Sequence, residues 1–251
     1  MSEPKSIILT GASRGIGLAV ARYLLGQKHN LFLVARTEEP MKELKKEFPS
    51  QVEFMSADLA DFEVGPKVIS QTLKSFSRID GLIINHGTLS PVKRIADSTA
   101  SEWRSTYDVN FFSAIAFITP AIPHLRQSHG TIILTSSGAA TSSYSTWGAY
   151  GSSKAAMNHL AATLKIEEPD ITTIAVRPGT VDTEMQAEIR KNKSVMDPKD
   201  AEKFASLHTE KKLLKPEQPG NVMARLAVSA NKELSGKFLN WNDKELAEYQ
   251  D

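Results

Sequence analysis

Tyr150 and Lys154 are four residues apart in a segment whose pattern predicts a helix over 149–165. Residues at this spacing lie on one helix face, so the phenol and the ammonium point the same way. A free tyrosine, with a pKa of about 10, is a poor acid–base catalyst at neutral pH. A nearby ammonium favours the phenolate and lowers that pKa, so the pair could protonate an oxygen that gains negative charge. The spacing alone is weak evidence, because such pairs also occur by chance.

Two further polar residues strengthen this pair. Ser137 closes the predicted strand 131–135, at the edge where parallel sheets present ligand-facing groups, and its hydroxyl could stabilise the same oxygen. Asn110 interrupts an apolar helical stretch, where its amide needs a partner. Each residue alone has a structural explanation: a core tyrosine, a solvated lysine, a turn serine or a buried amide. A chance occurrence of all four behind a nucleotide-binding turn is improbable.

The turn in question runs from Thr10 to Gly17 and holds Gly11, Gly15 and Gly17. A predicted strand precedes it and an amphipathic helix follows, with Gly26 at the position of a left-handed residue that ends a helix. Glycines allow backbone N–H groups and the helix start to approach a pyrophosphate. The alternative is a purely structural turn, but the flanking strand and helix favour nucleotide binding.

Short apolar runs alternate with helical patterns along the chain and predict the strands, at residues 7–10, 31–34, 52–55, 81–84, 131–135, 172–176 and 237–239. The early runs are almost wholly apolar, as in a parallel sheet covered on both faces. The sequence therefore predicts an α/β fold: a single-domain Rossmann-type, doubly wound parallel sheet of about seven strands with helices on both faces. We expect one domain over 1–251, with a mobile helical lid in the charged, proline-containing insertion 183–219.

Composition excludes several classes of function. Lys and Arg number 30 and Asp and Glu 29, so the net charge of +1 offers no basic field for nucleic acid or an anionic membrane. The chain has no cysteine, which removes disulfides and thiolate metal sites, and no metal is predicted. No apolar run approaches the roughly 18 to 20 residues of a membrane helix, and the polar start lacks a signal peptide pattern. A cytoplasmic location is predicted.

The interval from Gly11 through Gly15 to Gly17 resembles the TGxxxGxG turn of the short-chain dehydrogenase/reductase family. Tyr150 follows Ser137 by thirteen residues, as in that family, and Asn110 matches its Asn-Ser-Tyr-Lys tetrad. The resemblance covers nearly the whole chain. It implies that Tyr150 is the acid, that Ser137 orients a carbonyl, that Lys154 also binds the nicotinamide ribose, and that Asn110 holds a water that relays protons to the lysine.

The resemblance also implies the cofactor contacts. In the family the Asp after strand three meets adenine, the loop after strand four carries Asn-Asn-Ala-Gly, and Pro-Gly-x-Val-x-Thr after strand six holds the carboxamide and a phosphate. His86 departs from the second motif and is given no catalytic role. The expected contacts are Gly11, Ser13, Arg14, Gly15, Ile16, Gly17, Arg36, Asp58, Leu59, Asn85, Gly87, Tyr150, Lys154, Pro178, Gly179, Val181 and Thr183.

The end of the second strand indicates which dinucleotide binds. An acidic residue there would contact a ribose 2′-hydroxyl and repel a 2′-phosphate, but the chain has Ala35 followed by Arg36. Arg36 and Arg14 could pair with the phosphate, so NADP(H) is favoured. Two nearby acidic residues, Glu38 and Glu39, keep NAD(H) open.

Three residues beside Ser137 predict the substrate pocket: Tyr144 and Trp147 before the tyrosine, and Met185 in the insertion. Aromatic and methionine side chains suit a bulky aryl or diketone substrate. The alternative is that they only pack the lid against the body. Longer strings, such as Trp147-Gly148-Ala149-Tyr150-Gly151 and Asn240-Trp241-Asn242-Asp243, resemble the fungal benzil reductase branch, which is related to sepiapterin reductases. That resemblance implies reduction of α-diketones.

The sequence therefore predicts an NADPH-dependent carbonyl reductase. The alternatives are an NAD(H)-dependent alcohol dehydrogenase of the same fold and a non-catalytic module that senses NADP(H). The resemblance also implies a homodimer or homotetramer formed through the fourth and fifth helices, where small residues would permit close approach: Ala155, Ala156, Ala161 and Ala162.

Overall fold

The sheet of the computed structural model, which describes residues 3–250, holds seven parallel strands in the order β3-β2-β1-β4-β5-β6-β7. The chain moves outward to β3, returns past β1 to β4 and continues to β7, which is the doubly wound arrangement. The predicted fold class is confirmed. The strands are β1 Ser6–Thr10, β2 Asn30–Ala35, β3 Val52–Ser56, β4 Gly81–Ile84, β5 Thr131–Thr135, β6 Thr172–Arg177 and β7 Phe238–Asn240.

The central strands are apolar at their middle positions because both faces of the sheet are covered. Along β1, Ile7 and Leu9 pack into one core, and Ile8 packs into the other. In β2 the alternation repeats with Leu33 on the first face and Phe32 on the second. Side chains of a strand alternate between faces, so the middle positions of a strand buried on both sides are apolar, and the polar residues of β1, Ser6 and Thr10, stand at its ends.

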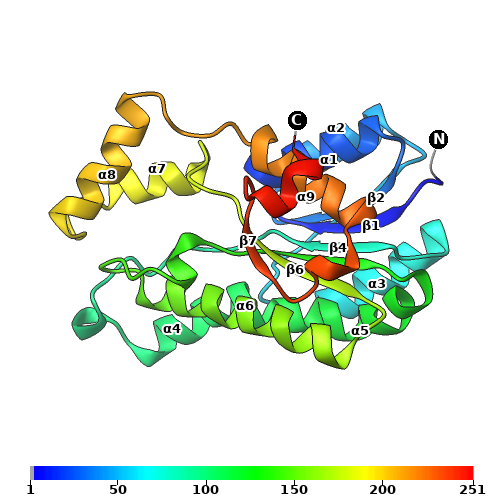
Figure 1. Cartoon of the computed structure of the whole chain (residues 1–251), viewed down its shortest axis with the longest axis horizontal. Coiled ribbons are helices and arrows are strands. Elements are labelled where there is room, and N and C mark those ends of the chain that lie inside the picture. The colour runs from blue at the N-terminus through cyan, green and yellow to red at the C-terminus, as the bar shows by residue number, and fades with distance from the viewer. Residues whose placement is uncertain (1–2, 251) are drawn as a thin grey trace.

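Helices form a layer on each face of the sheet (Figure 1). Helices α1, α2 and α9 cover the first core, and α3, α5 and α6 cover the second. The helices are α1 Gly15–Gly26, α2 Glu39–Glu47, α3 Val64–Phe76, α4 Ala100–Tyr107, α5 Ser113–Ser128, α6 Gly148–Glu167, α7 Glu184–Lys191, α8 Pro198–Thr209 and α9 Glu217–Ser229.

The end of α1 differs from the prediction. Gly26 is the last helical residue and does not have a positive φ, so its assignment as a left-handed cap is wrong. Lys28, two residues later, takes the left-handed conformation with φ of 67°. The helix thus runs one residue further than the glycine pattern indicated, and the reversal toward β2 falls on a lysine.

The insertion 183–219 contains α7 and α8, which extend to one side of the sheet beyond its carboxyl end (Figure 1). Their apolar side chains, including Ile189 and Phe204, pack with Trp147 and Tyr150 in a third, smaller cluster. The predicted helices are present, and the mobility of this segment stays a prediction. Within residues 3–250, no helix has the length and apolar composition needed to cross a membrane.

Candidate active site

The glycine turn is shaped by backbone contacts. Gly11 and Gly15 have φ of 67° and 52°, a region that side chains disfavour. A Cβ at Gly17 would lie 2.1 Å from the Gly11 carbonyl oxygen, so α1 can start this close to the turn only with glycine there. Asn85, after β4, donates a side-chain hydrogen bond to the Gly11 oxygen at 3.2 Å and fixes the turn against the sheet.

A cavity of about 620 Å³ opens at the carboxyl ends of the strands. Gly17 and Asn110 do not line it; Gly17 supports the turn from behind, and Asn110 lies beneath the loop after β4. The other predicted cofactor and substrate residues all line the cavity: Gly11, Ser13, Arg14, Gly15, Ile16, Arg36, Asp58, Leu59, Asn85, Gly87, Ser137, Tyr144, Trp147, Tyr150, Lys154, Pro178, Gly179, Val181, Thr183 and Met185.

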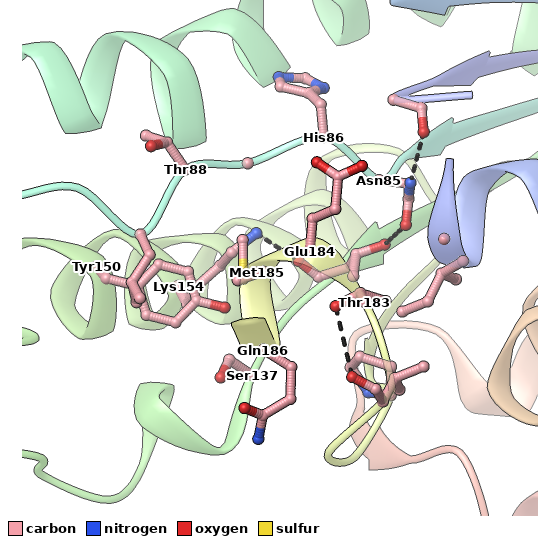
Figure 2. Close-up of a pocket in the computed structure, with 18 of the residues that line it drawn as sticks. Asn85, His86, Thr88, Ser137, Tyr150, Lys154, Thr183, Glu184, Met185 and Gln186 are labelled. Atoms are coloured by element: carbon pink, nitrogen blue, oxygen red, sulfur yellow. Dashed lines mark hydrogen bonds between the residues drawn. The ribbon is translucent and has the colours of Figure 1, made fainter. Parts of the chain in front are cut away.

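Ser137, Tyr150 and Lys154 meet at one wall of this cavity, where β5 and α6 come together (Figure 2). The Ser137 hydroxyl accepts a hydrogen bond from the Ala139 backbone N–H at 3.1 Å, which fixes its position after β5. Lys154 is 3% exposed, and its Nζ lies 5.9 Å from the centroid of the Tyr150 ring. An acid, an orienting hydroxyl and a cation therefore share one site.

The pKa values differ from what the Tyr/Lys spacing suggested. Burial raises the pKa of Tyr150, and a hydrogen bond with Ser137 acts in the opposite direction. Burial also lowers the pKa of Lys154 to about 8, and its ammonium donates to the Thr135 carbonyl oxygen at 2.7 Å. In the chain alone the Tyr150 pKa is thus raised and not lowered, because burial is the largest influence on it.

Asn110 lies in a π-turn, Asp108–Phe112, between α4 and α5. Single π-turns inside helices often mark functional sites. The Asn110 amide accepts from the Thr88 N–H at 2.8 Å and donates to the Thr88 carbonyl at 2.9 Å and to the Ser153 hydroxyl at 3.1 Å. Its amide thereby ties the loop after β4 to α6, the helix that carries Tyr150.

His86, which departs from the family motif, is a buried residue at the wall of the cavity. Its Nδ1 lies 2.8 Å from the Thr10 hydroxyl and its Nε2 lies 2.7 Å from the Ser113 hydroxyl. Burial, with the charge of Lys154, lowers the pKa of His86 to about 3, so the ring is neutral at physiological pH. His86 acts as a structural link between the glycine turn and α5.

Opposite the glycine turn the cavity is aromatic. The Trp147 ring stacks on Phe204 of α8 with centroids 5.2 Å apart and meets Tyr150 edge-on at 6.0 Å. Tyr144 lies 4.9 Å from Trp147. The same rings pack the insertion against the body and line the cavity, so the packing role and a place in the pocket wall are compatible. Contact of these rings with a substrate stays a prediction.

The two arginines predicted for the 2′-phosphate have different surroundings. Arg36 is exposed at the end of β2. Arg14, in the glycine turn, forms an ion pair with Glu184 at the start of α7, and both side chains are largely exposed. The turn and the insertion are thus joined by a salt bridge above the cavity.

Sequence reasoning missed several residues of the cavity: Thr88, Leu89, Arg177, Gln186, Ile189 and Phe204. Ile189 and Phe204 could be found from the helical period of the insertion. Gln186 gave no signal, because a glutamine in a helix rich in charged residues is ordinarily a solvent-facing residue.

The protein-family model described as short chain dehydrogenase matches residues 5–194 of this chain. The chain belongs to this family. An uncharacterized oxidoreductase of Schizosaccharomyces pombe is 41% identical over 94% of this chain and 96% of its own length. A benzil reductase of Saccharomyces cerevisiae that forms (S)-benzoin is 35% identical over 98% of this chain and 99% of its own length. A crystal structure of a short-chain dehydrogenase/reductase from the same yeast superimposes with a TM-score of 0.95 at 36% identity, covering 98% and 100% of the two chains.

Short-chain dehydrogenases are oxidoreductases that use a nicotinamide cofactor, and the site fits one. A Cβ at Gly11 would lie 2.9 Å from the His86 Cα, so only glycine lets the turn pack directly against the loop after β4, and Gly11 and Gly15 line the cavity where a pyrophosphate would bind. Gly87 faces Lys154 and Asn110, where a Cβ would meet their side chains at 3.4 and 3.3 Å. The glycine turn, Arg36, Asp58 and Lys154 would hold such a cofactor along the cavity.

Proposed function

We propose that the protein is an NADPH-dependent carbonyl reductase that acts on bulky aromatic ketones or α-diketones. The observation that carries the proposal is the meeting of Ser137, Tyr150 and Lys154 between a nucleotide-binding turn and an aromatic wall in one cavity. The similarity to a yeast benzil reductase supports the substrate class.

The chemistry divides between the cofactor and the chain. A bound reduced nicotinamide supplies a hydride to the carbonyl carbon. Ser137 donates a hydrogen bond to the carbonyl oxygen, and Tyr150 gives that oxygen its phenolic proton as the C=O bond becomes a C–O single bond. The products are an alcohol and the oxidised cofactor. Lys154, held by Thr135, supports the tyrosinate left behind until it regains a proton.

The preference for NADPH is supported by charge. No carboxylate follows β2 directly: Ala35 ends the strand, and the exposed Arg36 lines the cavity beside it. An exposed guanidinium can form an ion pair with a 2′-phosphate, whereas the 2′-hydroxyl of NADH is uncharged and cannot. The NAD(H)-dependent alternative requires Glu38 or Glu39 to take the role of the missing acid; neither lines the cavity.

Assembly into a homodimer or homotetramer is part of the same proposal. Phe112, directly before α5, is 45% exposed, and Ile166, near the end of α6, is 79% exposed. Apolar side chains on neighbouring helices suit a contact between copies. Of the four alanines, Ala161 packs into the core, and Ala162 is exposed.

The test follows nicotinamide absorbance with purified protein, benzil, and NADPH or NADH in parallel. We expect faster oxidation of NADPH, and a loss of about 10²- to 10⁴-fold in Tyr150→Phe, because the acid is removed. Tyr107→Phe is the matched control, since Tyr107 does not line the cavity and its hydroxyl has no hydrogen bond within residues 3–250. Full turnover by Tyr150→Phe would contradict the assignment of Tyr150 as the acid. Binding of NADPH without oxidation, across diketones, aldehydes and ketones, would instead support the sensing module.

A further inference from the structure

Gln186 is a buried polar residue on the lid helix α7. Its side chain is 2% exposed, while the helix as a whole carries glutamates, an arginine and a lysine that face outward. Removing an amide from water is costly unless both of its ends find partners.

Only one end of the Gln186 amide is engaged. Its Oε1 accepts a hydrogen bond from Arg190, one turn later, at 3.2 Å. Its Nε2 is buried and has no acceptor anywhere in residues 3–250. An unpaired buried donor is unfavourable, so an acceptor that reached this donor would stabilise it. The bond to Arg190 keeps the oxygen turned to the arginine and leaves the N–H groups as the free end.

The position of this donor points to the substrate and not to the cofactor. Gln186 lines the same cavity as Ser137 and Tyr150. Figure 2 draws Gln186 with Ser137 and Tyr150 among the residues that line this cavity. Met185 and Ile189, on either side of it in α7, supply apolar surface to the same wall.

We infer that Gln186 is the residue that selects vicinal dicarbonyl substrates, by donating a hydrogen bond from Nε2 to the second carbonyl oxygen. This inference rests on the proposed function, in which Ser137 and Tyr150 hold the first oxygen. The two oxygens of a vicinal dicarbonyl lie on adjacent carbons, so a substrate seated at Ser137 carries its second acceptor toward the neighbouring wall. A monoketone of the same shape leaves the donor unpaired, and the site discriminates against it.

The Trp147 indole N–H is also buried without an acceptor in the described chain. The Trp147 ring is held between Phe204, Tyr144 and Tyr150, so its nitrogen cannot turn to meet a ligand. The Gln186 amide, in contrast, is the end of an unbranched side chain of α7, which can turn toward a ligand. We therefore assign the second oxygen to Gln186 and use Trp147→Phe as the competing variant.

The experiment compares two substrates that differ in one group: benzil, and deoxybenzoin, in which a CH₂ replaces one carbonyl. The value of kcat/KM with NADPH is measured for each in the wild type and in Gln186→Met, Gln186→Glu, Trp147→Phe and Lys191→Met. Gln186→Met keeps the length of the side chain and removes the donor. Gln186→Glu also removes the donor but keeps an oxygen for Arg190. Lys191 is exposed on the same helix and does not line the cavity, so Lys191→Met is the matched control.

We expect both Gln186 variants to lower kcat/KM for benzil about tenfold and to leave deoxybenzoin within about twofold, with Lys191→Met unchanged. An equal fall for both substrates would overturn the inference in favour of a packing role. So would an unchanged ratio, or a change in the ratio from Trp147→Phe alone. If the wild type oxidises no NADPH with benzil, the proposed function itself fails. If it does, and the ratio of kcat/KM for benzil to that for deoxybenzoin is the same in the Gln186 variants, only this inference fails.

Discussion

Asn110 holds the backbone of Thr88 by both ends of its side-chain amide, accepting from its N–H at 2.8 Å and donating to its carbonyl at 2.9 Å. The same amide nitrogen reaches Ser153, whose hydroxyl donates to the Tyr150 carbonyl at 2.7 Å. One buried side chain thus sets the distance between the loop after β4 and the helix of the proposed acid.

We predict that Asn110→Ala lowers the free energy of unfolding by about 1–3 kcal/mol, because it leaves the Thr88 backbone groups without partners. It should also reduce kcat at least tenfold, since the loop and α6 lose their link. Urea unfolding and steady-state kinetics measure the two effects. Asn110→Asp keeps the acceptor for the Thr88 N–H and should lose less stability than Asn110→Ala. Unchanged stability in both variants would contradict this role.

The ion pair between Arg14 and Glu184 competes with any 2′-phosphate for the same guanidinium. Both side chains are exposed, so the pair is worth little, between about 0 and 1 kcal/mol. We predict that Glu184→Gln tightens NADPH binding by up to about fivefold and leaves NADH unchanged. Fluorescence titration with each cofactor checks this. Equal changes for NADPH and NADH would show that Arg14 does not meet the phosphate.

Arg36 makes a separate prediction about cofactor choice. Arg36→Ala should lower kcat/KM for NADPH about tenfold, because a charge-assisted contact with the phosphate is lost, and should leave NADH unchanged. Arg22→Ala is the control, since Arg22 is paired with Glu47 on α2 and lies outside the cavity. Retention of the full NADPH preference in Arg36→Ala would show that Arg36 does not meet the phosphate. Equal turnover with NADH in the wild type, unaffected by Arg36→Ala, would favour the NAD(H)-dependent alternative.

His86 makes stability depend on pH in one direction. Its folded-state pKa is about 3, below the ordinary value of 6.5, so between these values the unfolded chain binds a proton that the folded chain does not. Stability is therefore fully present above pH 6.5 and falls as the pH drops, by about 2 kcal/mol at pH 5. We predict that His86→Ala is less stable than the wild type at pH 7.5 but loses about 2 kcal/mol less between pH 7.5 and pH 5.

Urea unfolding at the two pH values measures this difference, and the acid effects of carboxylates cancel in it. His159 is exposed on α6, so His159→Ala should keep the pH dependence of the wild type. A wild-type loss retained by His86→Ala would show that other groups cause it.

Asp80, far from the cavity at the opposite end of the sheet, predicts a change in stability alone. Its carboxylate is buried, accepts from the Ser6 N–H at 2.9 Å and pairs with Arg78 at 2.7 Å. Asp80→Ala should lower the free energy of unfolding by about 1–3 kcal/mol, because it leaves the buried Ser6 N–H without its acceptor, while the partly exposed Arg78 keeps its ion pair with Glu3. Glu47→Ala, which removes an exposed pair, should cost no more than about 1 kcal/mol. Equal costs for the two variants would contradict the burial argument.

Much of the fold was determined by local pattern. Every predicted strand is present within one or two residues at its ends, because a strand covered on both faces is apolar over most of its length. The glycine turn was also predictable, since Gly11 and Gly15 need positive φ and the flanking elements restrict its setting. Where two residues could each reverse the chain, as at Gly26 and Lys28, composition favoured the wrong one.

The sequence by itself determined the doubly wound sheet, the nucleotide-binding turn and the Asn-Ser-Tyr-Lys set, because each depends on spacing along a single element or on residue type. Only the tertiary structure decided how deeply these groups are buried and which distant groups they meet. Lys154 bonds to Thr135, Arg14 pairs with Glu184, and the Gln186 amide is buried with its Nε2 unpaired among the described residues. Burial sets the cost of a charge or an unpaired N–H group, and burial arises only when faces far apart in the chain come together.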